Sequence, residues 1–254
     1  MTQTTELEQR PARSRRPLAI LAIVAVLAVG AVAVAYLAFF NDDAPERLAL
    51  SDQPAATTPA PSGGGATAPS SSSTDVAGTW RAAAGSEAGY RVREKLAALP
   101  AKSDAVGRTP AVTGTVRVED HGGSLVATDA RFEADLTRLT SDESRRDNRI
   151  RTDGLETSRF PRATFVSTSP ITLPAETTAG QAVKVSAVGD LTLHGVTKRV
   201  TIPLDVRYTG GRGELVGSLS FPMSDFDIDP PNVGGFVTVD PDATLEFKLL
   251  LEKA

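Results

Sequence analysis

Three aspartates toward the C-terminal end, Asp225, Asp227 and Asp229, have the spacing of the first ligands in a calcium-binding loop. Such a loop needs a glycine at its sixth position for a sharp turn and a bidentate glutamate at its twelfth. Pro230 stands at the first of these positions and Phe236 at the second. The spacing therefore does not predict a calcium site.

The chain contains two histidines, His121 and His194, and no cysteine. An ordinary zinc site draws most of its ligands from these residue types, so no zinc site is predicted. The sequence also lacks a nucleophile elbow, a P-loop and a Gly-x-Gly-x-x-Gly turn after a strand. Glu94 with His194 is the single acid-base pair that can be named. We therefore predict a protein without catalytic residues, metal or cofactor.

Two polar positions allow opposite interpretations. His194 precedes Gly195, and it either contacts the polar head of a ligand or forms part of a tight turn. Arg146 and Asp147 either orient a ligand head group or tie a helix to a neighbouring strand. The structural interpretation is the more common one for residues of these types in such places.

The N-terminal part of the chain is divided by composition. Residues 1–17 carry four arginines and two glutamates, and residues 18–40 are 23 consecutive residues without a charge. At about 1.5 Å per residue this stretch is roughly 35 Å long as a helix, enough to cross a bilayer. A cleaved signal peptide, cut near residues 33–35, is the alternative, although its apolar region is usually shorter.

The charges beside this stretch predict its orientation. Arginines precede it, and Asp42 and Asp43 follow it, which places residues 1–17 as a tail in the cytoplasm and the rest outside, in a single-pass cell-membrane protein. Residues 41–74 are rich in Pro, Ala, Thr, Ser and Gly and predict a flexible linker with a reach of about 30 Å. The chain carries a net charge of −4, and the part after the basic tail is more acidic still, so nucleic acid is not a predicted partner.

Residues 75–254 show the alternation of apolar and polar side chains that is typical of half-buried strands. The pattern is clearest on either side of the His194-Gly195 pair. It also predicts one inward face that runs through Val126, Thr128, Ala130, Phe132, Ala134 and Leu136. Eight such strands, joined by short turns, predict an all-β, antiparallel, up-and-down barrel. The charged segment 141–151 breaks the period of two and predicts a short helix over one rim.

The inward positions include small residues where a filled barrel would normally carry Leu or Ile. They are Ala130, Ala134, Ala187, Gly189 and Gly217. An eight-stranded barrel is wide enough either to be filled by side chains or to hold one small ligand. The small residues favour a hollow barrel, and a barrel filled by its own side chains is the alternative.

Four blocks of sequence, in this order along the chain, resemble the YceI-like family. The blocks are the opening strand 80–92 with Ser86 and Tyr90, the segments 146–151 and 160–165, the segment 190–198, and the segment 224–228. The resemblance covers nearly all of residues 75–254. It implies an extended lipocalin-like barrel that binds a polyisoprenoid or another long-chain lipid and performs no catalysis.

The resemblance also implies a set of ligand contacts. Many members of the family carry a histidine near the lipid head group where this chain has Glu94, and a carboxylate would repel a pyrophosphate. Predicted head-group contacts are Glu94, Arg146, Asp147 and His194. The predicted lining of the pocket is Tyr90, Val92, Phe132, Leu136, Phe165, Leu191, Leu193, Ile202, Leu204, Phe221, Phe226 and Phe247.

Together these observations predict a membrane-anchored, outward-facing protein that binds a polyisoprenoid or another long-chain lipid, such as an acyl lipid, and sequesters or transports it. The alternative is a structural or interaction module of the cell envelope with a filled barrel. An enzyme acting on a bound lipid through Glu94 and His194 is a third interpretation. The sequence leaves the oligomeric state open, and a dimer is compatible with it.

Overall fold

A computed structural model of the chain describes residues 44–51, 76–96, 102–233 and 237–254. Within these residues no helix has the length and apolar character needed to cross a bilayer. The predicted tail 1–17, the predicted span 18–40 and most of the predicted linker 41–74 lie outside the described residues. They stay predictions.

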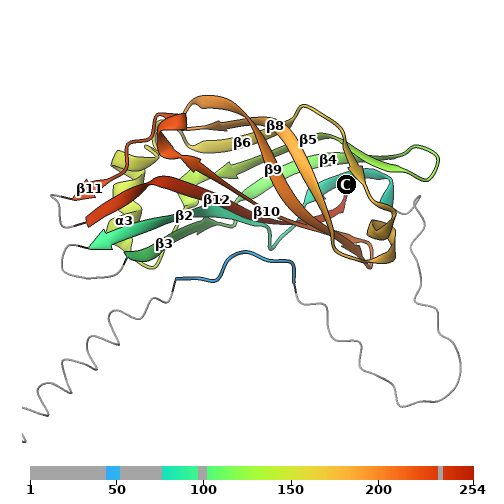
Figure 1. Ribbon diagram of the computed structural model, residues 1–254, viewed down its shortest axis with the longest axis horizontal. Helices are drawn as coiled ribbons and strands as arrows, with labels where there is room; N and C mark the ends of the chain where they lie inside the picture. The colour runs from blue at the N-terminus through green and yellow to red at the C-terminus, as the bar shows by residue number, and fades with distance from the viewer. Residues whose placement is uncertain (1–43, 52–75, 97–101, 234–236) are drawn as a thin grey trace, which may run out of the picture. The chain divides into compact units, whose positions relative to one another are not determined.

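Residues 76–254 form an antiparallel β-barrel (Figure 1). Eight strands form the closed ring, because β1 pairs with both β4 and β12. The predicted all-β antiparallel barrel of eight strands is confirmed. The predicted opening strand 80–92 was wrong in one respect, because it is two strands separated by a turn at residues 83–86. In ring order the strands are β1 (Gly78–Ala82), β4 (Val112–Asp120), β5 (Leu125–Asp135), β6 (Arg162–Ser167), β8 (Val183–Leu193), β9 (Val196–Thr209), β10 (Arg212–Pro222) and β12 (Val237–Lys253).

Four further strands are attached to this ring. β2 (Glu87–Leu96) follows β1 along the same edge of the long strand β12 and pairs with β3 (Lys102–Thr109), a strand that the sequence pattern did not predict. The short strands β7 (Ile171–Leu173) and β11 (Asn232–Val233) pair with β5 and β12.

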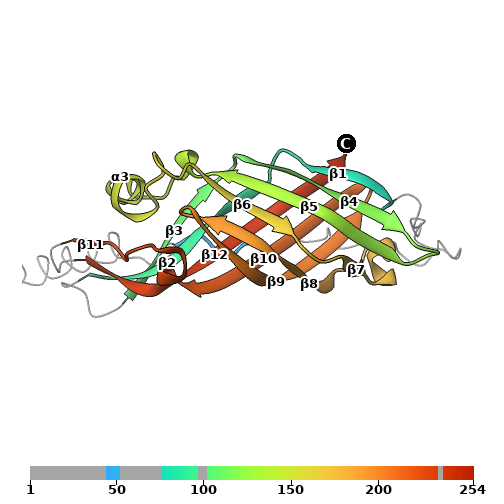
Figure 2. The same cartoon turned by 90° about the horizontal axis from the view of Figure 1, so that it is seen from above.

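The predicted short helix is present at one end of the barrel. It is α3 (Ser144–Arg149), which continues into a π-helical turn, η2 (Ile150–Gly154). The side chain of Glu143 caps it by accepting a hydrogen bond from the backbone N–H of Arg145 at 3.0 Å. Figure 2 shows α3 at one end of the barrel and β7 toward the other. We call these the helix end and the β7 end.

A β-bulge changes the predicted inward face of β5. Arg131 opposes Thr115, whereas Thr128 opposes Arg117, so β5 contains one extra residue between these pairs. Asp129, with φ of 51°, takes up the difference. Because the bulge reverses the alternation, Leu125 and Ala127 point inward, and the expectation that Val126 and Thr128 would do so was wrong.

The turn between β8 and β9 is the His194-Gly195 pair. Both residues have positive φ angles, 52° and 78°. Such a two-residue turn matches the twist of the strands it joins, and glycine adopts it without steric cost. His194 therefore has a structural role in the turn.

The buried side chains of the barrel form two clusters. One, the cavity half, lies toward the β7 end and includes Trp80, Val116, Ile202, Tyr208 and Leu249. The other, the packed half, lies toward the helix end. Its buried members are Leu136, Leu139, Ala163, Leu191, Leu193, Phe221, Met223, Phe226, Ile228 and Ala243.

Residues 44–51, within the predicted linker, lie along the outer wall of the barrel, and we call them the strap (Figure 1). Three arginines of the wall donate to backbone carbonyl oxygens of the strap: Arg91 to Pro45 at 2.6 Å, Arg108 to Glu46 at 2.5 Å, and Arg207 to Ser51 at 2.6 Å. Each arginine also contacts a barrel carboxylate. The strap is thus recognised through its main chain by side chains that are already oriented.

Candidate binding cavity

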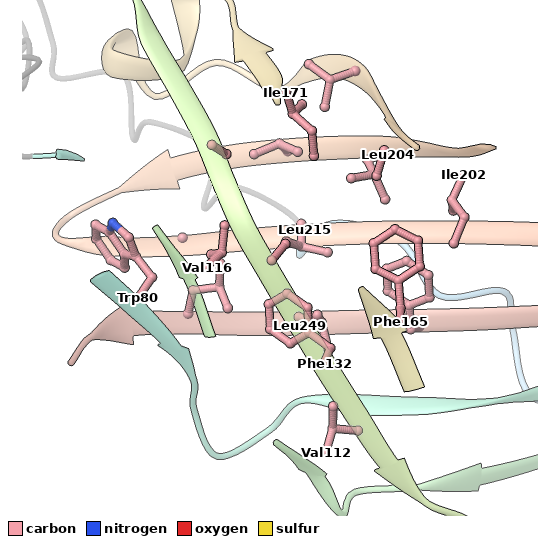
Figure 3. Close-up of a pocket in the computed structure, with 18 of the residues that line it drawn as sticks. Trp80, Val112, Val116, Phe132, Phe165, Ile171, Ile202, Leu204, Leu215 and Leu249 are labelled. Atoms are coloured by element: carbon pink, nitrogen blue, oxygen red, sulfur yellow. The ribbon is translucent and has the colours of Figure 1, made fainter. Parts of the chain in front are cut away.

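The cavity half of the barrel encloses an apolar cavity of about 170 Å³. Figure 3 shows its wall, with Trp80 at one end of the labelled side chains and Phe165 and Ile202 at the other. The lining comes from every strand of the ring and includes Val76, Trp80, Val116, Phe132, Phe165, Ile171, Ile202, Leu204, Tyr208, Leu215, Phe247 and Leu249. The barrel is therefore not filled by its own side chains along its whole length.

Three phenylalanines of the wall lie over glycines of neighbouring strands. Phe247 pairs directly with Gly217, and Phe132 pairs with Gly114. A Cβ atom placed on Gly217 would come within 2.5 Å of the Phe247 ring, and one placed on Gly189 within 2.4 Å of the Phe165 ring. The sequence suggested that Gly189 and Gly217 leave empty space, but in the structure phenylalanine rings lie over them. The glycines allow each ring to lie against the wall, and the centre of the barrel stays open for that reason.

Two polar groups near the β7 end differ: the Trp80 indole is hydrogen-bonded inside the barrel, whereas the buried hydroxyl of Thr177, which also lines the cavity, has no hydrogen-bond partner among the described residues. The indole N–H of Trp80 donates to the carbonyl oxygen of Val76 at 2.8 Å. Trp80 also packs edge-to-face against Tyr208, with ring centroids 5.8 Å apart. These contacts turn the apolar parts of both rings toward the cavity, whose wall then offers a guest almost only dispersion contacts and escape from water.

The packed half is filled by segments that fold into the barrel from outside the strand ladder. The 3₁₀ turn η4 (Met223–Phe226) places Met223 and Phe226 in the core, and η1 (Leu136–Arg138) places Leu136 there. Phe226 is only 1% exposed and packs edge-to-face on Phe221, with ring centroids 5.0 Å apart. Side chains from these segments thus occupy the interior of the barrel at this end.

An ion pair closes the helix end. The guanidinium of Arg146, on α3, donates from Nε and Nη2 to the two carboxylate oxygens of Glu94, on β2, and both distances are 3.1 Å. Arg146 also contacts Asp142. Burial acts to lower the pKa of Arg146, but the hydrogen bonds and negative charge of Glu94 and Asp142 outweigh it, and the pKa rises above its ordinary value. Glu94 and Arg146 thus neutralise each other.

Tyr90 lies between this ion pair and the cavity along β2. Its ring covers Gly107 of β3, and its hydroxyl is buried with no hydrogen-bond partner among the described residues. Burial raises the pKa of Tyr90 above its ordinary value, with Arg146 acting in the opposite direction, so the hydroxyl stays neutral. It is a free hydrogen-bond donor at the inner side of the helix end.

With this geometry established, comparisons with known proteins identify the family. The model of the YceI-like domain matches residues 81–251. The chain belongs to the YceI-like family. The resemblance carried by its four sequence blocks is therefore confirmed.

Relatives of this YceI-like chain are bacterial proteins. A UPF0312 protein of Vibrio parahaemolyticus is 34% identical over 119 residues, which are 44% of this chain and 58% of that protein. A UPF0312 protein of Shewanella denitrificans is 39% identical over 97 residues, which are 35% of this chain and 47% of that protein. The chain thus spans about half the length of the curated relatives it matches.

A solved structure has the same fold. It is a polyisoprenoid-binding domain from Saccharophagus degradans, implicated in plant cell wall breakdown. The match covers 70% of this chain and 99% of that one, with a TM-score of 0.50 and 18% sequence identity. At this identity the likeness supports the YceI-like barrel fold alone.

The predicted lining residues of the YceI-like barrel divide between the two halves. The wall of the cavity includes Phe132, Phe165, Leu191, Ile202, Leu204 and Phe247, and Leu191 also packs in the packed half, so it lies at the boundary. The others belong to the packed half or lie against it: Tyr90, Val92, Leu136, Leu193, Phe221 and Phe226. Contact of either group with a ligand stays a prediction, and only the first group faces open space in the structure.

The four predicted head-group residues lie at or near the helix end and have internal partners. Asp147 accepts hydrogen bonds from the backbone N–H and the hydroxyl of Ser141, at 2.9 and 2.7 Å. His194 Nδ1 lies 3.1 Å from the carbonyl oxygen of Phe226, and its Nε2 is buried 3.7 Å from a carboxylate oxygen of Glu156. With Glu94 and Arg146 paired to each other, these groups fix α3 and the β8–β9 turn in place. A role in ligand binding stays a prediction.

Sequence reasoning missed several wall residues. Tyr208, Leu215 and Leu249 have the inward parity that the alternation assigns to their strands, so this signal could have found them. Trp80 on β1 and Ile171 on β7 lie on strands too short to show a period. In the described part of the chain, no three carboxylate or imidazole groups come together as metal ligands would.

Proposed function

We propose that this chain is a binding protein for a polyisoprenoid or another long-chain lipid, held at the outer surface of the cell membrane by residues 18–40. The apolar cavity of about 170 Å³ inside the closed barrel is the observation that supports lipid binding most directly. The surface that faces the cavity is almost wholly apolar, which favours binding over catalysis.

The energetics favour a long guest. Each buried methylene contributes about 0.8 kcal/mol, so ten contribute about 8 kcal/mol. Association costs about 4 to 15 kcal/mol, and a short apolar molecule would therefore bind weakly. A cavity of about 170 Å³ holds only a short length of such a chain, since a cavity of similar size in another protein takes one benzene molecule. A long guest therefore requires side chains of the packed half to move.

The strap refines the membrane-anchor proposal. Three residues, and thus four steps of the chain, separate the end of the apolar stretch at residue 40 from the first described strap residue, Ala44. At about 3.3 to 3.6 Å per residue, they span at most roughly 14 Å. Only a short part of the predicted linker therefore precedes the strap along the chain, and the rest follows it.

The test uses the single tryptophan of the chain, Trp80, whose indole lies on the wall of the cavity. The full-length protein is reconstituted in nanodiscs of one synthetic phospholipid, and the fluorescent isoprenoid alcohol retinol is added. We expect saturable energy transfer from Trp80 to retinol. The variant Leu204→Arg, which places a charge on the cavity wall, should lose it. Equal transfer in both proteins, or none in either, would reject the proposal.

A further inference from the structure

The ring of strands is not hydrogen-bonded along its whole length. Residues 164–167 of β6 pair with residues 189–192 of β8, and the backbone N–H of Thr168 reaches the carbonyl oxygen of Val188 at 2.9 Å. Beyond this point the chain turns away, and β7 pairs with β5 instead. In the described part of the chain, no ladder joins β7 to residues 183–187 of β8, which pair with β9 on their other side. We call this interruption the seam.

A groove on the outside of the barrel meets the seam. It has a volume of about 660 Å³ and runs across β8, β9 and β10, from the strap residues Arg47 and Leu48 to Pro170 and Pro174 beside β7. Three residues line both this groove and the inner cavity: Ile171, Val185 and Leu204. Ile171 and Val185 stand on the two sides of the seam. The groove and the cavity are thus separated there by side chains alone.

Both ends of the cavity are closed by buried groups. At the β7 end Trp80 is 2% exposed and is held by its hydrogen bond to Val76. Toward the helix end Phe226 is 1% exposed and Met223 is 4% exposed. Passage through either end requires these groups to move, and passage between paired strands breaks backbone hydrogen bonds in an apolar setting. Opening the seam breaks no strand pairing.

We propose that the apolar ligand enters and leaves the cavity sideways, through the seam between β7 and β8. The chain of the ligand would pass between Ile171 and Val185, and its polar end would remain in the groove. The groove suits such an end because polar side chains, among them Lys184, Ser186 and Ser218, stand beside apolar ones there. This inference rests on the proposed lipid binding and adds the path to it.

The test is a reversible bond across the seam. Thr172 on β7 and Lys184 on β8 stand on the two sides of the seam, both line the groove, and both side chains are exposed. The variant Thr172→Cys/Lys184→Cys can form a disulfide there, because the natural chain has no cysteine to compete. The matched control is Ser220→Cys/Thr244→Cys, at two directly paired residues of β10 and β12 whose hydroxyl oxygens are 2.9 Å apart. A bismaleimide crosslinker replaces the disulfide if the seam is too wide for one.

Retinol uptake and release are followed through Trp80 in the full-length protein in nanodiscs. Closing the seam should slow both rates at least tenfold, reduction of the disulfide should restore them, and equilibrium affinity should stay unchanged. Closing the control pair should change neither rate. Unchanged rates with the seam crosslinked would overturn the side path while leaving lipid binding intact. Absence of uptake in the unmodified protein would instead overturn the proposed function, and the side path with it.

Discussion

The two halves of the barrel are built from the same strands, and their inward faces alternate in the same way, yet one encloses a cavity and the other is occupied by side chains of inserted segments. β8 contributes Ala187 to the cavity half and Leu193 to the packed half. The difference arises from what surrounds the strands. In the cavity half, Phe247 lies flat over Gly217. In the packed half, Phe226 enters from η4 and stacks on Phe221.

Whether a side chain points into the barrel and whether the barrel is filled at that position are therefore separate properties. Parity is a property of each strand, because successive side chains point to opposite faces. Filling depends on whether an aromatic ring finds a glycine across the ladder, and on whether a non-strand segment reaches into the barrel end. A cavity remains where the aromatic rings pack against the wall and no non-strand segment inserts its side chains into the barrel.

The largest expected effect is a contrast between two phenylalanines. Replacing Phe226 by alanine should lower the free energy of unfolding by about 3–5 kcal/mol, since it empties a close-packed site. Replacing Phe247 should cost less than half as much, because one side of its ring already faces open space. Urea denaturation of both variants measures the difference. Equal losses would show that the cavity half is packed as tightly as the packed half.

Sequence reasoning predicted the part of the fold that depends on single strands. The alternation in β8 and β9 and the turn at His194-Gly195 were visible, because short-range sterics determine both. The bulge at Asp129 was not, since a bulge is recognised only when the partner strand is known. The strap was interpreted as linker because its docking depends on arginines more than 40 residues away, and main-chain carbonyls leave no mark in its own sequence.

The candidate site was predictable only as a list of inward residues. Phe165 and Phe221 have the same residue type and the same parity, yet the first lies on the cavity wall and the second in the packed half. What separates them is Gly189 beside one and Phe226 beside the other, which are cross-strand and through-space neighbours. The register of a barrel has to be known before such neighbours can be assigned.

A second pair of variants tests the void from the opposite direction. Ala243→Leu, in the packed half, should cost about 1–3 kcal/mol of stability, because it overfills a close-packed core, and retinol uptake should persist. Ala187→Leu, on the cavity wall, should leave stability nearly unchanged and reduce uptake, because the added carbons occupy the guest's space. Thermal denaturation and Trp80 energy transfer measure the two properties. If Ala187→Leu lost stability and Ala243→Leu lost retinol uptake instead, the division into two distinct halves would be wrong.

The helix end offers an effect of intermediate size. Replacing Glu94 by glutamine removes the more buried of the two carboxylates that pair with Arg146 and should cost about 1–2 kcal/mol, because the partly buried guanidinium keeps only the exposed Asp142 as a counterion. The matched control is Asp153→Asn, which breaks the exposed ion pair with Arg149 and should cost at most a few tenths of a kcal/mol. Chemical denaturation compares them. If the two losses are equal, the Glu94–Arg146 pair does not hold the helix end.

The smallest expected effect on global stability concerns the strap and depends on pH. Burial alone would raise the pKa of Glu214, but hydrogen bonds from Ser51, Lys248 and Arg207 lower it from 4.5 to about 2. A carboxylate with a lowered pKa stabilises the state that binds it above its unperturbed pKa, and this contribution is lost as the pH falls through the lowered value. The docked strap should therefore be fully stable above pH 4.5 and weaken as the pH falls toward about 2.

Hydrogen exchange of the Ser51 amide, which donates to Glu214 at 2.7 Å, reports on this docking directly. Its protection, corrected for the intrinsic rate at each pH, should fall between pH 4.5 and about 2 in the natural protein. Glu214→Gln should show weak protection that does not change over this range, because the titrating group is gone. Asp205→Asn, which removes an exposed ion pair with Lys184, should behave like the natural protein. Protection that falls in the same way in the glutamine variant would mean that another group holds the strap.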